Sequence, residues 1–452
     1  MQKKIIWRSF SIITAAILLT GSLLLTGCDE EEKKKMEQLQ QQQESIGTKF
    51  LKSQENADKK PKPAEPDEPS TNGLGISDSK YEESITKSLV SKNNNYLVKK
   101  VLEKMRTGDE VIISALGGSV TEGAGPSSYT QGYAYQFKDM FIEKYAANKD
   151  KVKFVPAGIG GTPSPMGLVR YQKDVVNKGG RDPDLLIIEF AVNDWLECSK
   201  TRAMEYLVRN ALEHNTAVIM LYGAATYGNQ QEQIKPVADF YKLPQVSVRD
   251  GLKNSGVNQQ KDSKVYYTDM VHPTKNGHTF MAKCIMNLID QIDASQIDEK
   301  AAIPDGYKNE NAFTKFATIY GDTQDKNVSI APGAFDHKDD AIQAYMHGGK
   351  SFPQNWSRSG DGGNTPFTMT LNCKSLIMVY KNANNNSFGK AEIFVDGKSH
   401  GTYAGHEEGG WNNCMVVMII DEPTSSQHTV EIKPAAGEED KSFTILAFGY
   451  AQ

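Results

Sequence analysis

Four short stretches, far apart along the chain, carry groups that together could perform acyl transfer on a serine. They supply a serine, a glycine loop, an asparagine and an Asp/His pair, and they are Gly117–Gly123, Gly158–Thr162, Ala191–Asp194 and Asp269–Pro273. Serine acyl transfer needs a nucleophile, a base, a group that orients the base, and donors for the oxyanion. Each stretch alone is a weak signal, whereas all four in this order indicate one hydrolytic site.

Ser119, His272 and Asp269 are the candidate catalytic residues. Ser119 lies at an expected strand-to-helix turn among glycines, where a substrate carbonyl could approach; the alternative is that it only caps the next helix. His272 follows Asp269 by three residues and precedes Pro273. In a tight loop an aspartate at this distance can reach the imidazole and fix its tautomer. His278, in the following helix, is expected to be structural.

Two further residues are candidate donors to an oxyanion. Asn193 follows the apolar run Ile187–Val192, so its side-chain amide is expected at the end of a strand. Gly161 could offer its backbone N–H from the glycine loop, and the N–H of Ser119 is a third candidate. The glycine loop is not a dinucleotide fingerprint, because Pro163 stands where the third glycine is needed.

The four blocks resemble those of the SGNH/GDSL hydrolases, a family named for its serine, glycine, asparagine and histidine. The resemblance implies a serine hydrolase that works through an acyl-enzyme, with no cofactor and no metal. Two departures from the family pattern are visible. Gly-Gly-Ser replaces the usual Gly-Asp-Ser, and Pro156 stands where the second block usually opens with asparagine.

Several residues close to these blocks have a structural explanation and are not candidates for the site. Asp194 is expected to hold the Asn193 loop, Arg170 to pair with a nearby acid, and Glu189 lies at the end of an expected strand. Trp195 could either line a pocket or pack in the interior. The sequence leaves those two roles open.

The first 28 residues resemble the leader of a bacterial lipoprotein. Three basic residues precede the apolar run Phe10–Leu25, and Leu-Thr-Gly-Cys then looks like a lipobox. We therefore expect residues 1–27 to be a signal peptide and Cys28 to carry the lipid, which leaves the folded part facing outward from the bacterial membrane. The alternatives are an uncleaved anchor and an ordinary signal peptide.

The composition argues against a nucleic-acid partner. The chain has 452 residues with 51 Lys and Arg against 56 Asp and Glu, a formal net charge of −5, which gives no electrostatic reason to bind a polyanion. The four cysteines other than Cys28 match no zinc spacing, and their pairing stays open. Residues 28–80 are rich in charged residues, glutamine and proline, which predicts a disordered tether.

Residues 81–303 show short apolar strands alternating with helices. Strands are expected at 111–116, 152–156, 184–190, 217–222 and 245–248, and helices at 96–107, 134–145, 168–177, 202–214, 231–241 and 273–292. This alternation predicts an α/β fold, with a parallel sheet covered by helices on both faces in three layers. Active sites of such sheets lie at the carboxyl ends of the strands, and Ser119, Gly161 and Asn193 all follow strands.

Residues 304–452 differ, with Gly, Asn and Ser between short apolar strands and a hairpin signal at Asp396-Gly397. This pattern predicts an all-β sandwich, and it resembles the jelly-roll accessory domains found beside some carbohydrate esterases. Trp356 and Trp411 in this region could either stack on sugars or belong to the core.

The function that these features favour is hydrolysis of O-acetyl esters on an extracellular polysaccharide. The expected partners are an acylated carbohydrate or a small ester, and the membrane through a lipid on Cys28, with no nucleic acid. Three alternatives remain open: a glycan-binding surface lipoprotein with an inactive hydrolase domain, a lipase or thioesterase of the same family, and an acetyltransferase that uses the same triad.

Overall fold

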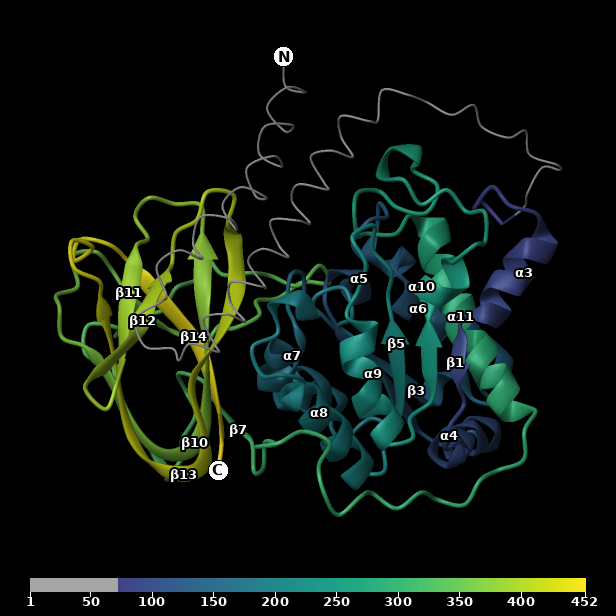
Figure 1. Ribbon diagram of the computed structural model, residues 1–452, viewed down its shortest axis with the longest axis horizontal. Coiled ribbons are helices and arrows are strands. Elements are labelled where there is room, and N and C mark those ends of the chain that lie inside the picture. Colours follow the sequence, from purple (N-terminus) through teal and green to yellow (C-terminus); the bar gives the residue numbers. More distant parts are fainter. Residues whose placement is uncertain (1–71) are drawn as a thin grey trace, which may run out of the picture.

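A computed structural model describes residues 72–452, which form two domains side by side (Figure 1). Residues 1–27, Cys28 and most of the expected tether lie outside the described residues. Within 72–452, the helices are too short or too polar to cross a bilayer. The expected domain boundary near residue 304 falls in the connection between the last helix of the first domain and the first strand of the second.

The first domain is built on a six-stranded sheet. Its strands, in the order in which they pair, are β1 (Leu89–Ser91), β6 (Gln245–Ser247), β5 (Ala217–Tyr222), β4 (Leu185–Glu189), β2 (Val111–Gly117) and β3 (Val152–Gly158). The five strands β2 to β6 are parallel, as their buried apolar sequences predict. The edge strand β1 pairs with β6 in the antiparallel sense, so the sheet is mixed. Three residues carry too little periodicity to reveal such a strand.

Helices cover both faces of this sheet, which gives the three-layer arrangement expected from the sequence. One face carries α3 (Asp78–Lys87), α4 (Tyr96–Thr107), α6 (Tyr133–Tyr145), α10 (Val248–Leu252) and α11 (Lys275–Asp293). The other carries α7 (Ser164–Tyr171) with its π-helical extension Gln172–Asn177, α8 (Arg202–Glu213) and α9 (Gln231–Phe240). Helix α4 ends at Gly108, which has a φ of 77°, the left-handed conformation that glycine adopts without strain.

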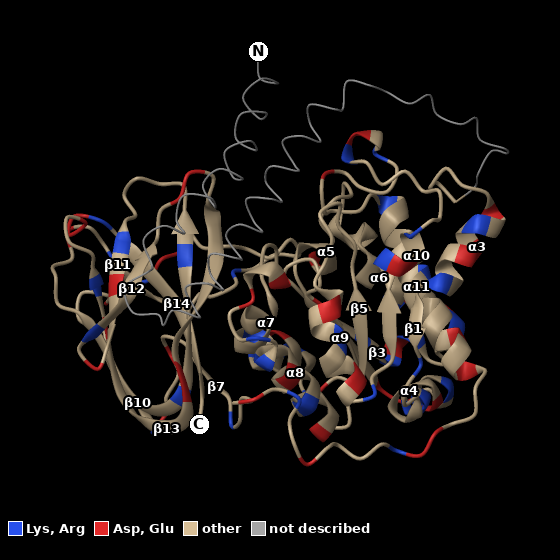
Figure 2. Cartoon of the chain, viewed as in Figure 1, with Lys and Arg blue, Asp and Glu red and all other residues tan. Residues whose placement is uncertain are grey.

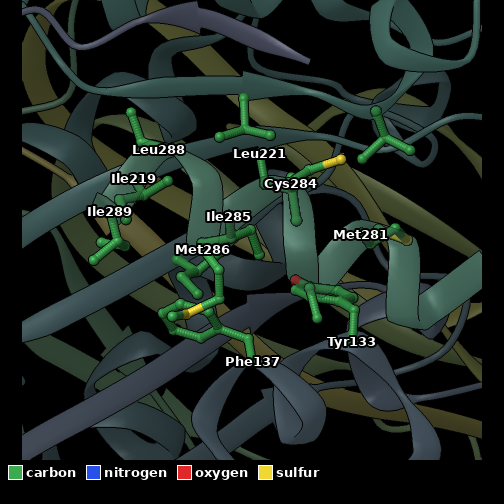
Figure 3. Packing of buried hydrophobic residues seen from close by; sticks show 14 of the residues in the cluster. Tyr133, Phe137, Ile219, Leu221, Met281, Cys284, Ile285, Met286, Leu288 and Ile289 are labelled. Carbon is green, nitrogen blue, oxygen red and sulfur yellow. The ribbon is translucent and has the colours of Figure 1, made fainter. Parts of the chain in front are cut away.

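The packing on the α11 face explains why these helices form. Figure 3 shows Phe137 of α6 close to Ile285 of α11, in one cluster with Met281 of α11 and with Ile219 and Leu221 of β5. All five side chains are fully buried. Apolar positions three or four residues apart place one face of α11 against the sheet. This packing fixes the start of α11 and therefore the end of the Asp269–Pro273 loop that precedes it.

Residues 72–80 belong to the fold of the first domain. Leu74 and Ile76 are buried in the first core, and helix α3 starts at Asp78 with the Ser77 side chain accepting the Lys80 N–H. The expectation that the tether extends to residue 80 is therefore wrong for residues 72–80. The sequence did not reveal this, because Leu74 and Ile76 are only two apolar residues at the end of a long polar, proline-rich stretch.

The second domain is an all-antiparallel β-sandwich, as expected. Its strands are β7 (Ala317–Ile319), β8 (Val328–Ala331), β9 (Trp356–Arg358), β10 (Phe367–Ala383), β11 (Lys390–Val395), β12 (Lys398–Ala404), β13 (Trp411–Pro434) and β14 (Phe443–Ala451). The first part of β10 pairs with β8 and the second with β14, so this strand passes from one layer to the other. The turn Asp396-Gly397 joins β11 to β12 with positive φ at both residues, as a type I′ hairpin requires.

The two domains share a hydrophobic core. Helices α7 and α8 lie between the parallel sheet and the β-sandwich (Figure 1), and their buried side chains belong to one cluster with Ile377, Val379 and Leu446 of the sandwich. At its edge the Arg202 guanidinium donates to both carboxylate oxygens of Asp421, at 2.6 and 2.8 Å. Figure 2 shows both signs of charge interspersed on the two domains. The two domains therefore pack against each other through a continuous apolar contact.

Candidate active site

Ser119 lies at the carboxyl end of β2, as the first residue of the one-turn helix α5 (Ser119–Glu122). The two glycines before it leave room for neighbouring side chains. A Cβ on Gly117 would lie 2.1 Å from Thr121 Oγ1, and one on Gly118 would lie 2.1 Å from Asn193 Oδ1. Such distances exclude any side chain, so glycine is required for Asn193 to pack beside the serine.

The buried side chain of Arg170 holds the carboxyl ends of β2 and β3 next to Ser119. Its guanidinium donates to the carbonyl oxygens of Gly117 at 2.8 Å and Ala157 at 2.6 Å, and lies 3.3 Å from Asp174 Oδ2. Arg170 therefore pairs with a nearby acid, as expected, and it also satisfies two carbonyls where β2 and β3 leave the sheet. This role could not be inferred from spacing.

The three candidate catalytic residues form one chain of hydrogen bonds. His272 Nε2 lies 2.8 Å from Ser119 Oγ, and His272 Nδ1 lies 2.7 Å from Asp269 Oδ2. The other carboxylate oxygen of Asp269 accepts the backbone N–H groups of Val271 and His272, both at 2.8 Å. The three-residue spacing thus folds into the tight loop expected from the sequence. The side chains of Ser119, Asp269 and His272 are all half-buried.

The environment of Asp269 keeps its carboxylate charged. Partial burial would raise the pKa of Asp269, but the hydrogen bonds from the His272 ring and from the backbone N–H groups of His272 and Val271 outweigh it and lower the pKa to about 2. An ionised carboxylate only accepts hydrogen bonds, so the ring proton of neutral His272 resides on Nδ1. Nε2 is then free to accept the hydroxyl proton of Ser119.

The candidate oxyanion donors come from two loops that contact the Ser119 segment and from Ser119 itself. The side chain of Asn193 packs on Gly118, next to Ser119, and its own backbone N–H donates to Phe190 O at 2.8 Å to close the turn after β4. Gly161 has a φ of 71°, and its neighbour Gly160 faces the Ser119 side chain, with its Cβ position 3.8 Å from Ser119 Cβ. Ser119 is the first residue of α5, so its N–H has no hydrogen-bond partner within the helix and is available to an oxyanion.

Residues 115–280 match the model of the GDSL-like lipase/acylhydrolase family. The matched range contains all five candidate residues: Ser119, Gly161, Asn193, Asp269 and His272. The first domain is therefore similar to this family and is named the GDSL-like domain. The GDSL-like domain thus begins with β2 in the family model, and helices α3 and α4 and strand β1 precede it in this chain.

Two solved structures of a two-domain esterase share the fold of both domains. A two-domain esterase active on acetylated mannans aligns with a TM-score of 0.68 and 22% identity, over 81% of this chain and 98% of its own. The same kind of esterase co-crystallised with mannopentaose aligns with the same TM-score and 23% identity, over the same shares of both chains. An acetylxylan esterase from Geobacillus stearothermophilus aligns with a TM-score of 0.33 and 17% identity, over 41% of this chain and 96% of its own. A search of curated proteins gave no match.

The β-sandwich contributes side chains next to the GDSL-like domain's glycine loop. Gln343 Nε2 donates to Gly160 O at 2.8 Å, and the backbone N–H of Met346 donates to Glu122 Oε1 at 2.7 Å. Trp411 lies over Gly161, because a Cβ there would lie 3.1 Å from the indole ring. The indole is 56% exposed. None of these contacts carries a sequence signal, since they join segments more than 180 residues apart.

The tryptophans that the sequence left open take different roles. Trp356 is only 7% exposed and belongs to the sandwich core, whereas Trp411 is at the surface. Trp195 is 48% exposed, two residues after Asn193, and its ring meets Tyr227 edge to face at 6.3 Å. Tyr227 donates to Val192 O at 3.2 Å. Exposed aromatic rings therefore lie beside both candidate oxyanion donors.

The remaining polar residues near the site are buried and structural. His278 accepts the Tyr133 N–H at 3.0 Å and lies 3.0 Å from Ala124 O, and burial lowers its pKa to about 4. Burial also raises the pKa of Glu189 to about 7 and that of Asp194 well above its usual value. Asp194 holds the Asn193 loop, as expected, by accepting the N–H of Ser164 at 2.7 Å. Within residues 72–452, no group of three metal-binding side chains occurs.

Proposed function

We propose that this protein is a serine esterase in which Ser119, His272 and Asp269 form the catalytic triad. The observation that carries the proposal is the unbroken chain of hydrogen bonds from Asp269 through His272 to Ser119 Oγ, at 2.7 and 2.8 Å. A serine activated in this way beside several N–H donors has the parts that acyl transfer requires.

In the proposed mechanism Ser119 Oγ attacks the ester carbonyl carbon while His272 Nε2 takes the hydroxyl proton. The resulting oxyanion accepts hydrogen bonds from the backbone N–H groups of Gly161 and Ser119 and from the Asn193 side chain. As the tetrahedral intermediate collapses, Nε2 returns the proton to the leaving alcohol oxygen. Water then attacks the acyl group on Ser119 by the same route, which releases the acid and restores the serine.

We further propose that the substrate is an O-acetylated polysaccharide. The exposed rings of Trp411 over Gly161 and of Trp195 and Tyr227 beside Asn193 support this choice, because flat aromatic faces bury the apolar faces of sugar rings. The fold shared with a two-domain esterase active on acetylated mannans makes acetylated mannan the first polymer to test.

An acetate-release screen tests this proposal. Purified protein is incubated with a small aryl acetate and with acetylated mannan, xylan, chitooligosaccharides and peptidoglycan, beside a Ser119→Ala control. We expect release from the aryl acetate and from at least one polymer, and none by the variant. Release that the variant retains in full would refute the mechanism, and an enzyme that cleaves only the aryl ester would refute the polysaccharide substrate.

We also propose that the chain is exported and anchored to the bacterial membrane through a lipid on Cys28, which the lipobox-like sequence Leu25-Thr26-Gly27-Cys28 supports. Expression in a bacterial host with labelled palmitate is expected to label the protein in the membrane fraction. Cys28→Ser is expected to lose the label. Labelling that persists in this variant would argue for a different site or a different anchor.

A further inference from the structure

We propose that Gln343, a residue of the β-sandwich, is a positioning residue that orients the Gly161 N–H toward the oxyanion. This inference rests on the proposed function, since it assigns Gly161 as a donor in ester cleavage. It implies that the second domain supplies part of the geometry of the active site in addition to the exposed Trp411.

The side chain of Gln343 is held at both ends of its amide. It is 8% exposed, its Nε2 donates to Gly160 O at 2.8 Å, and its Oε1 accepts the Cys414 N–H at 3.0 Å. The backbone carbonyl of Gln343 is fixed as well, because it accepts both the N–H and the hydroxyl of Ser351, at 3.0 and 2.8 Å. A buried amide with these partners has one orientation open to it.

The geometry of the peptide group transfers this orientation to Gly161. The carbonyl of Gly160 and the N–H of Gly161 belong to one planar peptide unit, which is trans, so the two bonds point in opposite directions. A donor that fixes the carbonyl on one side therefore fixes the N–H on the other. Glycine at both positions makes the unit prone to rotate without such a partner. The hydrogen bond on the carbonyl also polarises the unit and strengthens its N–H as a donor.

Glu122 makes a second contact between the glycine loop and the sandwich. The Glu122 carboxylate, at the end of α5, accepts the Met346 N–H at 2.7 Å. Burial raises the pKa of Glu122, and contacts with the backbone N–H groups of Met346 and Gly160 offset this only in part. Gly160 thus lies between a carboxylate of the GDSL-like domain and an amide of the sandwich. Both of these groups are tied to the sandwich segment that contains Gln343 and Met346.

The main variant is Gln343→Met, which keeps the length of the side chain and removes both polar atoms. Loss of a whole oxyanion donor costs about 10²–10³ in kcat, so loss of its orientation is expected to lower kcat on an aryl acetate by roughly 10- to 100-fold. The KM for this small ester should change by less than about twofold, because the donor acts on the transition state. Gln343→Glu, which keeps the acceptor for the Cys414 N–H, serves if the methionine variant is insoluble.

Tyr345→Phe is the matched control. Its hydroxyl comes from the same segment of the sandwich and lies 2.6 and 2.8 Å from the carboxylate oxygens of Asp174, so its loss weakens the interface without touching the glycine loop. We expect a melting temperature lowered as much as in Gln343→Met, with kcat within about twofold of the wild type. Equal losses of kcat in the two variants would reduce Gln343 to a contact that holds the domains together, and would overturn the proposal.

A crystal structure of Gln343→Met decides the same point without any activity. We expect the Gly160–Gly161 peptide to rotate or to show two orientations, with Ser119 and His272 in place. One unchanged orientation would overturn the proposal. Failure of the proposed function would give a different result, namely wild-type protein that is no more active than Ser119→Ala. In that case the orientation of the Gly160–Gly161 peptide still tests the role of Gln343.

Discussion

Within residues 72–452, two sets of a serine, a histidine and an aspartate are joined by hydrogen bonds: Ser119–His272–Asp269 in the GDSL-like domain and Ser426–His428–Asp396 in the β-sandwich. In the Ser119 set the two contacts of the imidazole measure 2.8 and 2.7 Å. In the Ser426 set they measure 2.9 and 2.8 Å. The same nitrogen faces the serine in both. By these distances alone the two sets are indistinguishable.

The two serines differ in the groups that surround them: N–H donors lie near Ser119, and a carboxylate lies near Ser426. Ser119 opens a helix beside glycines and the Asn193 amide, and these groups are the donors proposed for the oxyanion. Ser426 lies in the long strand β13, and the carboxylate of Glu422 is 3.4 Å from its Oγ and 3.5 Å from His428 Nε2. A carboxylate there would repel an oxyanion and compete for the imidazole proton.

The Ser426 set has a structural explanation. Asp396, in the turn between β11 and β12, accepts the Thr429 N–H at 2.8 Å as well as the buried His428 ring. These bonds tie a hairpin turn to the neighbouring strand. A hydrogen-bonded triad therefore marks a hydrolytic site only when donors for the oxyanion accompany it.

Deleting residues 304–452 removes the Ser426 set together with Gln343, and we expect this to have the largest effect. The deletion exposes the apolar faces of α7 and α8 that pack on Ile377 and Leu446, so the remaining protein should be insoluble, or inactive on both aryl acetate and polymer. Soluble expression and turnover on both substrates provide the measurement. A soluble fragment with full activity on the aryl acetate would make the sandwich an independent binding module.

Removing the aspartate from each set is the next test. Asp269→Asn is expected to lower kcat on the order of 10³–10⁴-fold, because the amide can hold the imidazole in the wrong tautomer. Asp396→Asn, the matched change in the other set, should leave kcat within about twofold. Steady-state kinetics on an aryl acetate measure both. If the two variants lose activity equally, the assignment of roles from oxyanion donors is wrong.

The pKa values sharpen this test. The pKa of Asp269 is lowered to about 2, so the stabilisation that its hydrogen bonds provide is present at neutral pH and is lost only as the pH falls toward 2. The orientation of His272 by Asp269 is therefore expected to persist across the whole acidic range in which the enzyme stays folded. A fall in kcat around pH 4 that Asp269→Asn abolishes would show that this carboxylate titrates where we expect it not to.

Trp411 sharpens the contrast between the surroundings of the two serines, since its exposed ring lies over Gly161. Stacking of a sugar on about 50 Å² of this ring would contribute about 1.3 kcal/mol, so Trp411→Ala is expected to lower kcat/KM on acetylated polymer by about tenfold. Activity on the aryl acetate should change little. A loss of the same size on both substrates would mean that the ring only shapes the loop.

Ser426→Ala should have the smallest effect. Turnover is expected to stay within about twofold of the wild type on both substrates, and the loss of the hydroxyl's contacts with His428 and Glu422 should lower the melting temperature by less than about 2 °C. Kinetics and thermal unfolding on the full-length protein measure the two quantities. An activity lost in Ser426→Ala but kept in Ser119→Ala would reverse the assignment.

The sequence predicted most of the GDSL-like domain because its signals are local. Buried strands such as Val111–Gly117 are continuous apolar runs, and the Asp269–His272 loop closes over three residues. The register and length of β10 and β13 were not predictable, because both strands run through polar segments that resemble turns. The contacts of Gln343 and Trp411 depend on how the domains pack, and no periodicity or motif carries that information.

Trapping the acyl-enzyme and locating its acyl group identifies the nucleophile of this protein. Full-length protein is mixed briefly with an aryl acetate, quenched in acid, digested and analysed by mass spectrometry, in the wild type, in Ser119→Ala and in Ser426→Ala. We expect one acetyl group on Ser119 in the wild type and in Ser426→Ala, and none in Ser119→Ala. An acetyl group on Ser426, or turnover by wild-type protein without any acetylated serine, would show that Ser119 is not the nucleophile.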